Sequence, residues 1–307
     1  MSDLIWEISY LEKNLKPTNQ LGQELNLIYA SNSNLKDSNI LALSTALKQN
    51  SVFEGDLQLS ENHLTDQSVL YLTEALSLSQ ARIRAIDLST NFLKDKSGVY
   101  LGNLLSSNYP LQQLYLKNCS IGELGVQRIF EALETSTLQV LDIGLVNSNS
   151  LVTMGNYLSR PVHLKQLSFQ QAEAWSAASK SSFIQSIKKN YSILLYEVQS
   201  TDSPDFTEEV ISIADRNNVL NDQSVNESVQ SLSCDQKNFA AEIQKLIEND
   251  LQNLPVRVYL ENSIGTLLND GIYALMKFRY KESLPEKNTA VDNIKWLVRY
   301  ILDNSRN

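Results

Sequence analysis

Leu57-Gln-Leu59-Ser-Glu-Asn62-His-Leu64-Thr-Asp66 and Ile86-Asp-Leu88-Ser-Thr-Asn91-Phe-Leu93-Lys-Asp95 share one pattern and begin 29 residues apart. In each stretch two apolar residues flank a polar one, which is the alternation of a strand that is buried on one side. An asparagine, a further leucine and an aspartate follow at fixed offsets. Self-similarity at such an interval predicts a repeat architecture, in which each unit is one supersecondary element.

The same strand pattern recurs at intervals of 26 to 29 residues, and each copy is followed by apolar residues spaced three or four apart, as on a helix. One strand and one helix cannot bury their apolar faces alone, so stacked units must share a core. The sequence therefore predicts an α/β fold of about seven strand–helix repeats over residues 25–218, with residues 1–24 as an N-terminal cap. The predicted strand anchors are Ile28/Ala30, Leu57/Leu59, Ile86/Leu88, Leu114/Leu116, Leu141/Ile143, Leu167/Phe169 and Tyr196/Val198.

This pattern resembles the leucine-rich repeat, and its period is similar to that of the ribonuclease-inhibitor-like class. The resemblance implies a horseshoe whose asparagine position satisfies buried backbone groups in each turn. A cysteine alternates with asparagine there in the family, so Cys119 is expected to be a small buried side chain rather than a reactive thiol. The position is held by Ser33, Asn62, Asn91, Cys119, Val146, Ala172 and Thr201.

The residue between the two anchors of each strand is expected on the concave face of the horseshoe. Three of these seven residues are carboxylic acids and two are tyrosines, a composition that suits a polar groove for a protein partner. A merely solvated face is equally compatible with this composition, because exposed charge is the default. The seven residues are Tyr29, Gln58, Asp87, Tyr115, Asp142, Ser168 and Glu197.

Composition excludes several classes of protein. The apolar share of 42% and charged share of 20% are those of a globular chain. No run of 18 apolar residues and no secretory signal are visible, so neither a membrane partner nor secretion is expected. A net charge of −9 argues against binding nucleic acid. No metal-ligand spacing, phosphate loop or nucleophile–base pattern stands out, so we expect no enzyme, catalytic residue, metal or cofactor.

The C-terminal part has a different character. Residues 219–236 are polar and without a clear period, which predicts a linker. Residues 237–307 are predicted to form a small all-α module. Within them, Leu254, Pro255, Arg257, Tyr259 and Leu260 are followed by Leu268, Gly271 and Ile272, and later by Ile294, Trp296, Leu297, Tyr300 and Ile301.

These residues resemble the Dpy-thirty motif, a two-helix dimerisation and docking module related to the RIIa fold of protein kinase A regulatory subunits. The chain departs from the motif at Thr266, where the family usually has proline, and in a longer loop near residues 281–291. The resemblance implies a homodimer or heterodimer with a groove for an amphipathic helix of a scaffold protein. An alternative is that these helices cap the last repeat. The docking residues are expected to be Leu260, Ile264, Leu267, Leu268, Gly271, Ile272, Leu275, Ile294, Leu297 and Ile301.

The two resemblances together imply a non-enzymatic assembly protein in the cytoplasm. Axonemal proteins often join a docking module to a scaffold domain, so the first expectation is a structural subunit of the cilium or flagellum, in a radial spoke of the axoneme. Two alternatives stay open. One is a leucine-rich-repeat regulator or effector that binds a single protein target, and the other is a subunit of a histone methyltransferase-type complex in the nucleus.

Overall fold

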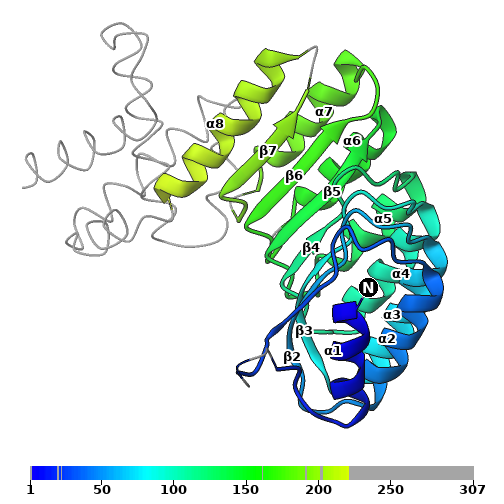
Figure 1. The fold of residues 1–307 in the computed structure, drawn as a ribbon. Helices are drawn as coiled ribbons and strands as arrows, with labels where there is room; N and C mark the ends of the chain where they lie inside the picture. The colour runs from blue at the N-terminus through cyan, green and yellow to red at the C-terminus, as the bar shows by residue number, and fades with distance from the viewer. Residues whose placement is uncertain are drawn as a thin grey trace, which may run out of the picture. The chain divides into compact units, whose positions relative to one another are not determined.

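The computed structural model describes residues 2–220 except 19, 20, 22, 161, 191, 201 and 202, and the described part is an α/β repeat structure (Figure 1). The chain divides into two compact units, Met1–Val210 and Ile211–Asn307. The described strands all lie in the first unit. They are β1 (Leu27–Tyr29), β2 (Glu54–Gln58), β3 (Arg82–Asp87), β4 (Gln113–Tyr115), β5 (Val140–Val146), β6 (Gln166–Gln171) and β7 (Leu195–Gln199).

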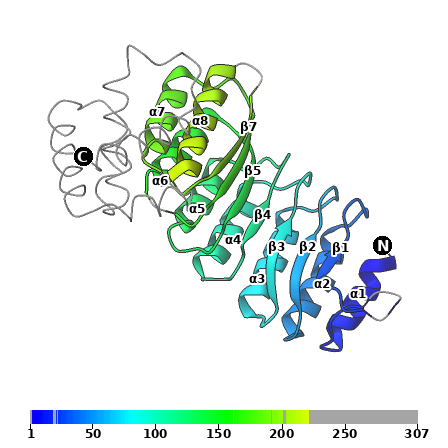
Figure 2. The ribbon, with the colours of Figure 1, turned by 90° about the vertical axis from the view of Figure 1, so that its left-hand side faces the viewer.

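The seven strands form one parallel sheet in the order of the sequence. Helices α2 to α7 all cover one face of this sheet and leave its other face open (Figures 1 and 2). The predicted α/β class and the seven strand–helix repeats are thus confirmed. The helices are α1 (Ser2–Glu12), α2 (Asp37–Gln49), α3 (Asp66–Leu78), α4 (Asp95–Ser106), α5 (Glu123–Ala132), α6 (Ser148–Leu158), α7 (Ala177–Ile187) and α8 (Pro204–Leu220).

The apolar periodicity accounts for the core between sheet and helices. The first anchor of every strand, from Ile28 to Tyr196, is at most 2% exposed. The helical residues at spacings of three and four are buried as well, for example Leu72 and Leu76 in α3. Burying one such side chain contributes about 1.5–3 kcal/mol. Because each helix lies between its neighbours, the repeats hold one another in place.

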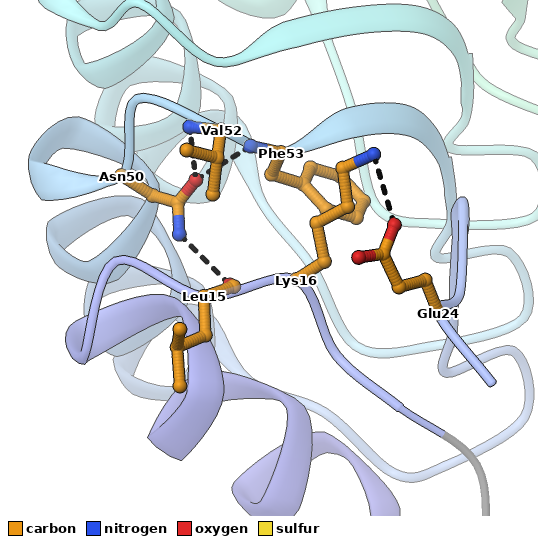
Figure 3. A network of polar contacts seen from close by, with 6 residues as sticks. All are labelled: Leu15, Lys16, Glu24, Asn50, Val52 and Phe53. Atoms are coloured by element: carbon orange, nitrogen blue, oxygen red, sulfur yellow. Dashed lines mark hydrogen bonds and ion pairs between the residues drawn. The ribbon is translucent and has the colours of Figure 1, made fainter. Parts of the chain in front are cut away.

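The segment after α1 is tied to the repeats by Asn50, which ends α2 (Figure 3). The Asn50 side chain donates to the carbonyls of Leu11 and Leu15 and accepts from the amides of Val52 and Phe53. These bonds satisfy backbone groups at the end of α1 and at the end of α2 together. Within the segment predicted as an N-terminal cap, α1 packs against α2. An ion pair between Lys16 and Glu24, at 3.2 Å, closes the connecting segment.

Asn62 shows what the asparagine position does. Its Oδ1 accepts from the amides of Ser33 and Leu35 in the preceding repeat, at 3.0 and 2.9 Å. Its Nδ2 donates to the carbonyls of Ala30, Leu59 and Ser60, at 2.8, 3.0 and 3.0 Å. One side chain thus saturates the backbone of two neighbouring turns, as the repeat resemblance implies.

Asn91 repeats this arrangement one turn later. It accepts from the amide of Leu64 at 3.1 Å and donates to the carbonyls of Leu59 and Leu88. Cys119, in the next turn, is fully buried, and its thiol lies 3.4 Å from the Leu88 carbonyl. Burial raises the pKa of the Cys119 thiol to about 11, so the group stays protonated at neutral pH.

The asparagine position changes function from Val146 onward. Val146 and Ala172 have no side-chain polar group, and the indole N–H of Trp175 donates instead to the Val146 carbonyl, at 2.8 Å. The ring of Trp175 also packs against Phe169 and Phe206, with ring centroids 5.8 and 5.3 Å apart. A buried aromatic residue with a polar tip thereby satisfies one backbone carbonyl of this turn. Thr201, the last member of the series, lies outside the described residues.

An acidic residue at the start of one helix stabilises the start of the next. Asp37 accepts from the amide and hydroxyl of Thr65 and from the hydroxyl of Ser68. Asp66 accepts in the same way from the amides of Lys94 and Ser97. Partial burial raises the pKa of Asp37, but these hydrogen bonds lower it by more, and the pKa lies below the usual 3.8. The stability that Asp37 contributes is therefore present above the pKa of the unfolded carboxyl and is lost as the pH falls below it.

Each of the first turns has a residue with left-handed backbone at the same place in the repeat, and the first turn has a second one, Asn34. Asn32, Glu61, Thr90 and Asn118 occupy the equivalent position, with φ between 51° and 58°. A β-branched residue is strained in this region, whereas asparagine adopts it readily. We therefore expect Thr90→Asn to raise the free energy of unfolding by about 0.5–1 kcal/mol. Urea unfolding followed by far-UV circular dichroism checks this, and a decrease in stability would show that the turn is not strained at Thr90.

The described boundaries differ slightly from the predicted ones. Helix α8 continues to Leu220, so it includes the first two residues of the predicted linker 219–236. In the sequence, the apolar spacing typical of a helix extends only to about Ile213, because the residues beyond are mostly polar. The rest of the linker and the predicted module at 237–307 lie outside the described residues.

Candidate protein-binding face

The open face of the sheet carries the residues predicted for the concave surface in a single row. In the strand pairing, Tyr29 is the partner of Gln58, Gln58 of Asp87, and Asp87 of Tyr115. The row continues from Tyr115 to Asp142, Ser168 and Glu197. We call these seven residues the central row. Because neighbouring strands lie about 4.8 Å apart, it spans roughly 29 Å across the sheet.

Exposure varies along the central row. Tyr29 is 61% exposed and Ser168 only 6%, while Gln58, Asp87, Tyr115 and Asp142 are half-buried. Ser168 donates a hydrogen bond to Oε2 of Glu197 at 2.9 Å, and this contact helps to cover the hydroxyl. Ser168 therefore contributes to the row mainly by positioning Glu197.

The middle of the row is an ordered Asp–Tyr–Asp set. Oδ1 of Asp87 accepts from the amide of Ser89, and Oδ1 of Asp142 accepts from the amide of Gly144, each at 2.9 Å. These local bonds fix both carboxylates while leaving Oδ2 of each without a hydrogen bond among the described residues. The hydroxyl of Tyr115 donates to the side chain of Gln113, at 3.0 Å.

The pKa values of Tyr115 and Asp142 are both raised, in part by the neighbouring carboxylates. Burial, followed by the carboxylates of Asp87, Asp142, Glu197 and Asp56, raises the pKa of Tyr115. Burial also raises the pKa of Asp142; the Gly144 amide and Lys117 oppose this, and Glu197 and Asp87 add to it. The carboxylates of strands β2, β3, β5 and β7 thus interact across one surface.

A second row, two residues earlier on each strand, borders the central row. The strand pairing aligns it as closely as the first. It mixes apolar and polar residues, and its two ends, Leu27 and Leu195, are 39% and 43% exposed. The sequence analysis did not predict its apolar members, although the same period of two identifies them. The row consists of Leu27, Asp56, Ala85, Gln113, Val140, Gln166 and Leu195.

An exposed aromatic pair stands in the turns that follow β2 and β3. Phe92 is 63% exposed, and its ring centroid lies 5.8 Å from that of His63. Each follows the asparagine of its turn directly, so the repeat brings the two side chains together. The sequence showed both residues, but it gave no sign that they form a pair at the surface.

The remaining sequence predictions concern the docking residues, metal ions and membranes. The ten predicted docking residues, from Leu260 to Ile301, lie outside the described residues. Within the described part, no group of three or more His, Cys, Asp and Glu side chains is placed to hold a metal ion. No helix in that part combines the length and apolar character needed to cross a membrane.

Comparisons with known proteins give little. No protein-family model matches the sequence, and no curated protein matches it. One similar solved structure is that of "Leiomodin-1 Actin-Binding Site 2 (ABS2)", at 12% sequence identity and a TM-score of 0.33. The match covers 69% of this chain and 87% of that one. Similarity at this level does not establish a shared fold.

Proposed function

We propose that this protein is a non-enzymatic scaffold that binds a protein partner on the open face of its leucine-rich-repeat-type sheet. The observation that carries the proposal is the central row, in which Tyr29, Tyr115 and three carboxylates are aligned on a face that helices α2 to α7 leave uncovered. Tyrosines give large contact area with little loss of side-chain freedom, and carboxylates give specificity at a polar interface.

The second part of the proposal concerns residues 237–307. Their resemblance to the Dpy-thirty motif supports a dimerisation and docking module that receives an amphipathic helix from another protein. A chain with two binding regions of this kind suits a structural subunit that joins neighbours within an assembly. The ciliary axoneme, and a radial spoke in particular, is the setting that the motif favours.

The experiment compares two variants of the full chain in co-purification from an extract of cells that express the protein. Asp87→Ala/Tyr115→Ala/Asp142→Ala should lose partners of the face and keep those of the module. Leu268→Asp places a charge in the apolar docking residues, at a cost of several kcal/mol, and should do the reverse. Quantitative mass spectrometry gives the readout, and circular dichroism confirms that both variants fold.

Tyr71→Ala, on helix α3, serves as the control for the face variant. Retention of every partner by the triple alanine variant would exclude binding at the face. Retention of every partner by Leu268→Asp would exclude the docking module and favour helices that cap the last repeat. The regulator or effector alternative predicts a single target, lost only from the face variant, whereas a histone methyltransferase-type complex predicts nuclear partners lost with Leu268→Asp.

A further inference from the structure

The carboxylates of the central row have a regular spacing. Asp87 is on β3, Asp142 on β5 and Glu197 on β7, so they occupy every second strand of the sheet. With about 4.8 Å between strands, neighbouring carboxylates of this series are roughly 10 Å apart. Tyr115 and Ser168 occupy the strands between them.

The central row contains these three carboxylates and no cationic side chain. Asp56, the fourth carboxylate, has a partner, since its Oδ1 lies 3.6 Å from Nε of Arg84. Of the described residues, Lys117 is the cation that acts on Asp142, and no ion pair involves Asp87, Asp142 or Glu197. A partner with complementary charge would relieve the mutual repulsion of these three carboxylates.

We propose that the open face binds an extended segment of a protein partner in which a cationic side chain, preferably arginine, recurs at every third residue. An extended left-handed segment rises about 3.1 Å per residue and repeats every three residues, so its equivalent side chains are about 9.3 Å apart. This matches two strand spacings, and three successive cations would reach Asp87, Asp142 and Glu197.

The side chains between the carboxylates favour arginine over lysine. Oδ2 of Asp87 and of Asp142 is available to a donor, while Oδ1 is held by the backbone. A guanidinium can bond such an oxygen and still stack on the neighbouring ring of Tyr115, which an ammonium does less well. The second row, with Val140 beside the middle of the site, offers apolar contact to the residues between the cations.

The inference rests on the proposed function and is tested with defined peptides and the full-length protein. The probe is fluorescein-labelled Arg-Pro-Pro-Arg-Pro-Pro-Arg, because proline holds the extended conformation. The matched peptide, Pro-Pro-Arg-Arg-Arg-Pro-Pro, has the same composition and charge with the arginines adjacent. Fluorescence anisotropy at low ionic strength measures both affinities, since added salt screens exposed charges.

We expect the spaced peptide to bind about fivefold more tightly than the clustered one. In Asp87→Asn/Asp142→Asn/Glu197→Gln its affinity should fall about tenfold, as expected for three exposed ion pairs. These substitutions retain the acceptors for Ser89, Gly144 and Ser168. The control Glu12→Gln/Glu74→Gln/Glu208→Gln removes the same charge from exposed helical residues and should bind within about twofold of the wild type.

Equal binding of the two peptides, or equal loss in both triple variants, would overturn the proposed spacing. If that result accompanied loss of a natural partner from Asp87→Ala/Tyr115→Ala/Asp142→Ala, the face would still be a binding site and only the class of partner would be wrong. If that alanine variant also kept every natural partner, the proposed function of the face would fall as well.

Discussion

Replacing Asn91 with alanine is expected to lower the free energy of unfolding by about 3–5 kcal/mol, because several buried backbone groups lose their partners together. Asn91 is 6% exposed, and its amide oxygen and nitrogen bond Leu64, Leu59 and Leu88. Alanine leaves these groups buried in a turn without a side-chain partner. No other nearby side chain reaches the Leu64 amide among the described hydrogen bonds.

Urea unfolding followed by far-UV circular dichroism measures the effect, and Asn103→Ala is the matched control. Asn103 lies on α4 and is exposed, with no hydrogen bond from its side chain among the described residues, so its replacement should change stability by less than about 0.5 kcal/mol. A similar small loss in both variants would mean that the asparagine position does not hold the turns.

The second large effect is expected at the contact between α4 and α5. A Cβ atom on Gly98 would collide with the backbone of Gly125, and one on Gly102 would lie 2.6 Å from the carbonyl oxygen of Arg128. Gly98→Ala must therefore push the two helices apart. We expect it to destabilise the protein by at least about 2 kcal/mol, even though alanine favours the helix by about 1 kcal/mol.

Gly155→Ala is the control for this prediction, because Gly155 is also helical but more loosely packed. Its Cβ would lie 3.2 Å from the Cβ of Ser186 and 3.3 Å from the Cα of Phe183, where small shifts can relieve the contact. Thermal unfolding of both variants gives the comparison. A Gly98→Ala variant as stable as Gly155→Ala would show that α4 and α5 tolerate separation.

The alignment of the central row can be predicted from the sequence because a strand has a period of two and buried anchors fix its phase. Once Leu57 and Leu59 are inside, Gln58 must face outward, and the repeat interval then aligns it with Asp87 and Tyr115. The hydrogen bonds of Asn62 followed from its position in the turn in the same way.

Other features could not be predicted from the sequence, because they depend on contacts between residues that the repeat pattern does not relate. The close approach of Gly98 and Gly125 arises from the packing of two helices, and neither glycine lies in the repeated strand pattern. Trp175 bonds the Val146 carbonyl from a different place in the repeat than the asparagine position. Exposure of Phe92 likewise depends on what packs around it, which apolar character alone does not reveal.

Photo-crosslinking from the central row tests most directly whether the open face binds a partner. A benzoylphenylalanine in place of Tyr115 keeps an aromatic side chain at the middle of the face, and the same residue in place of Tyr71 samples the helical layer. Each full-length protein is irradiated in an extract of cells that express it, and the cross-linked proteins are identified by mass spectrometry. The account predicts a defined partner cross-linked from position 115 and absent from position 71. No product at 115, or the same products at both positions, would contradict it.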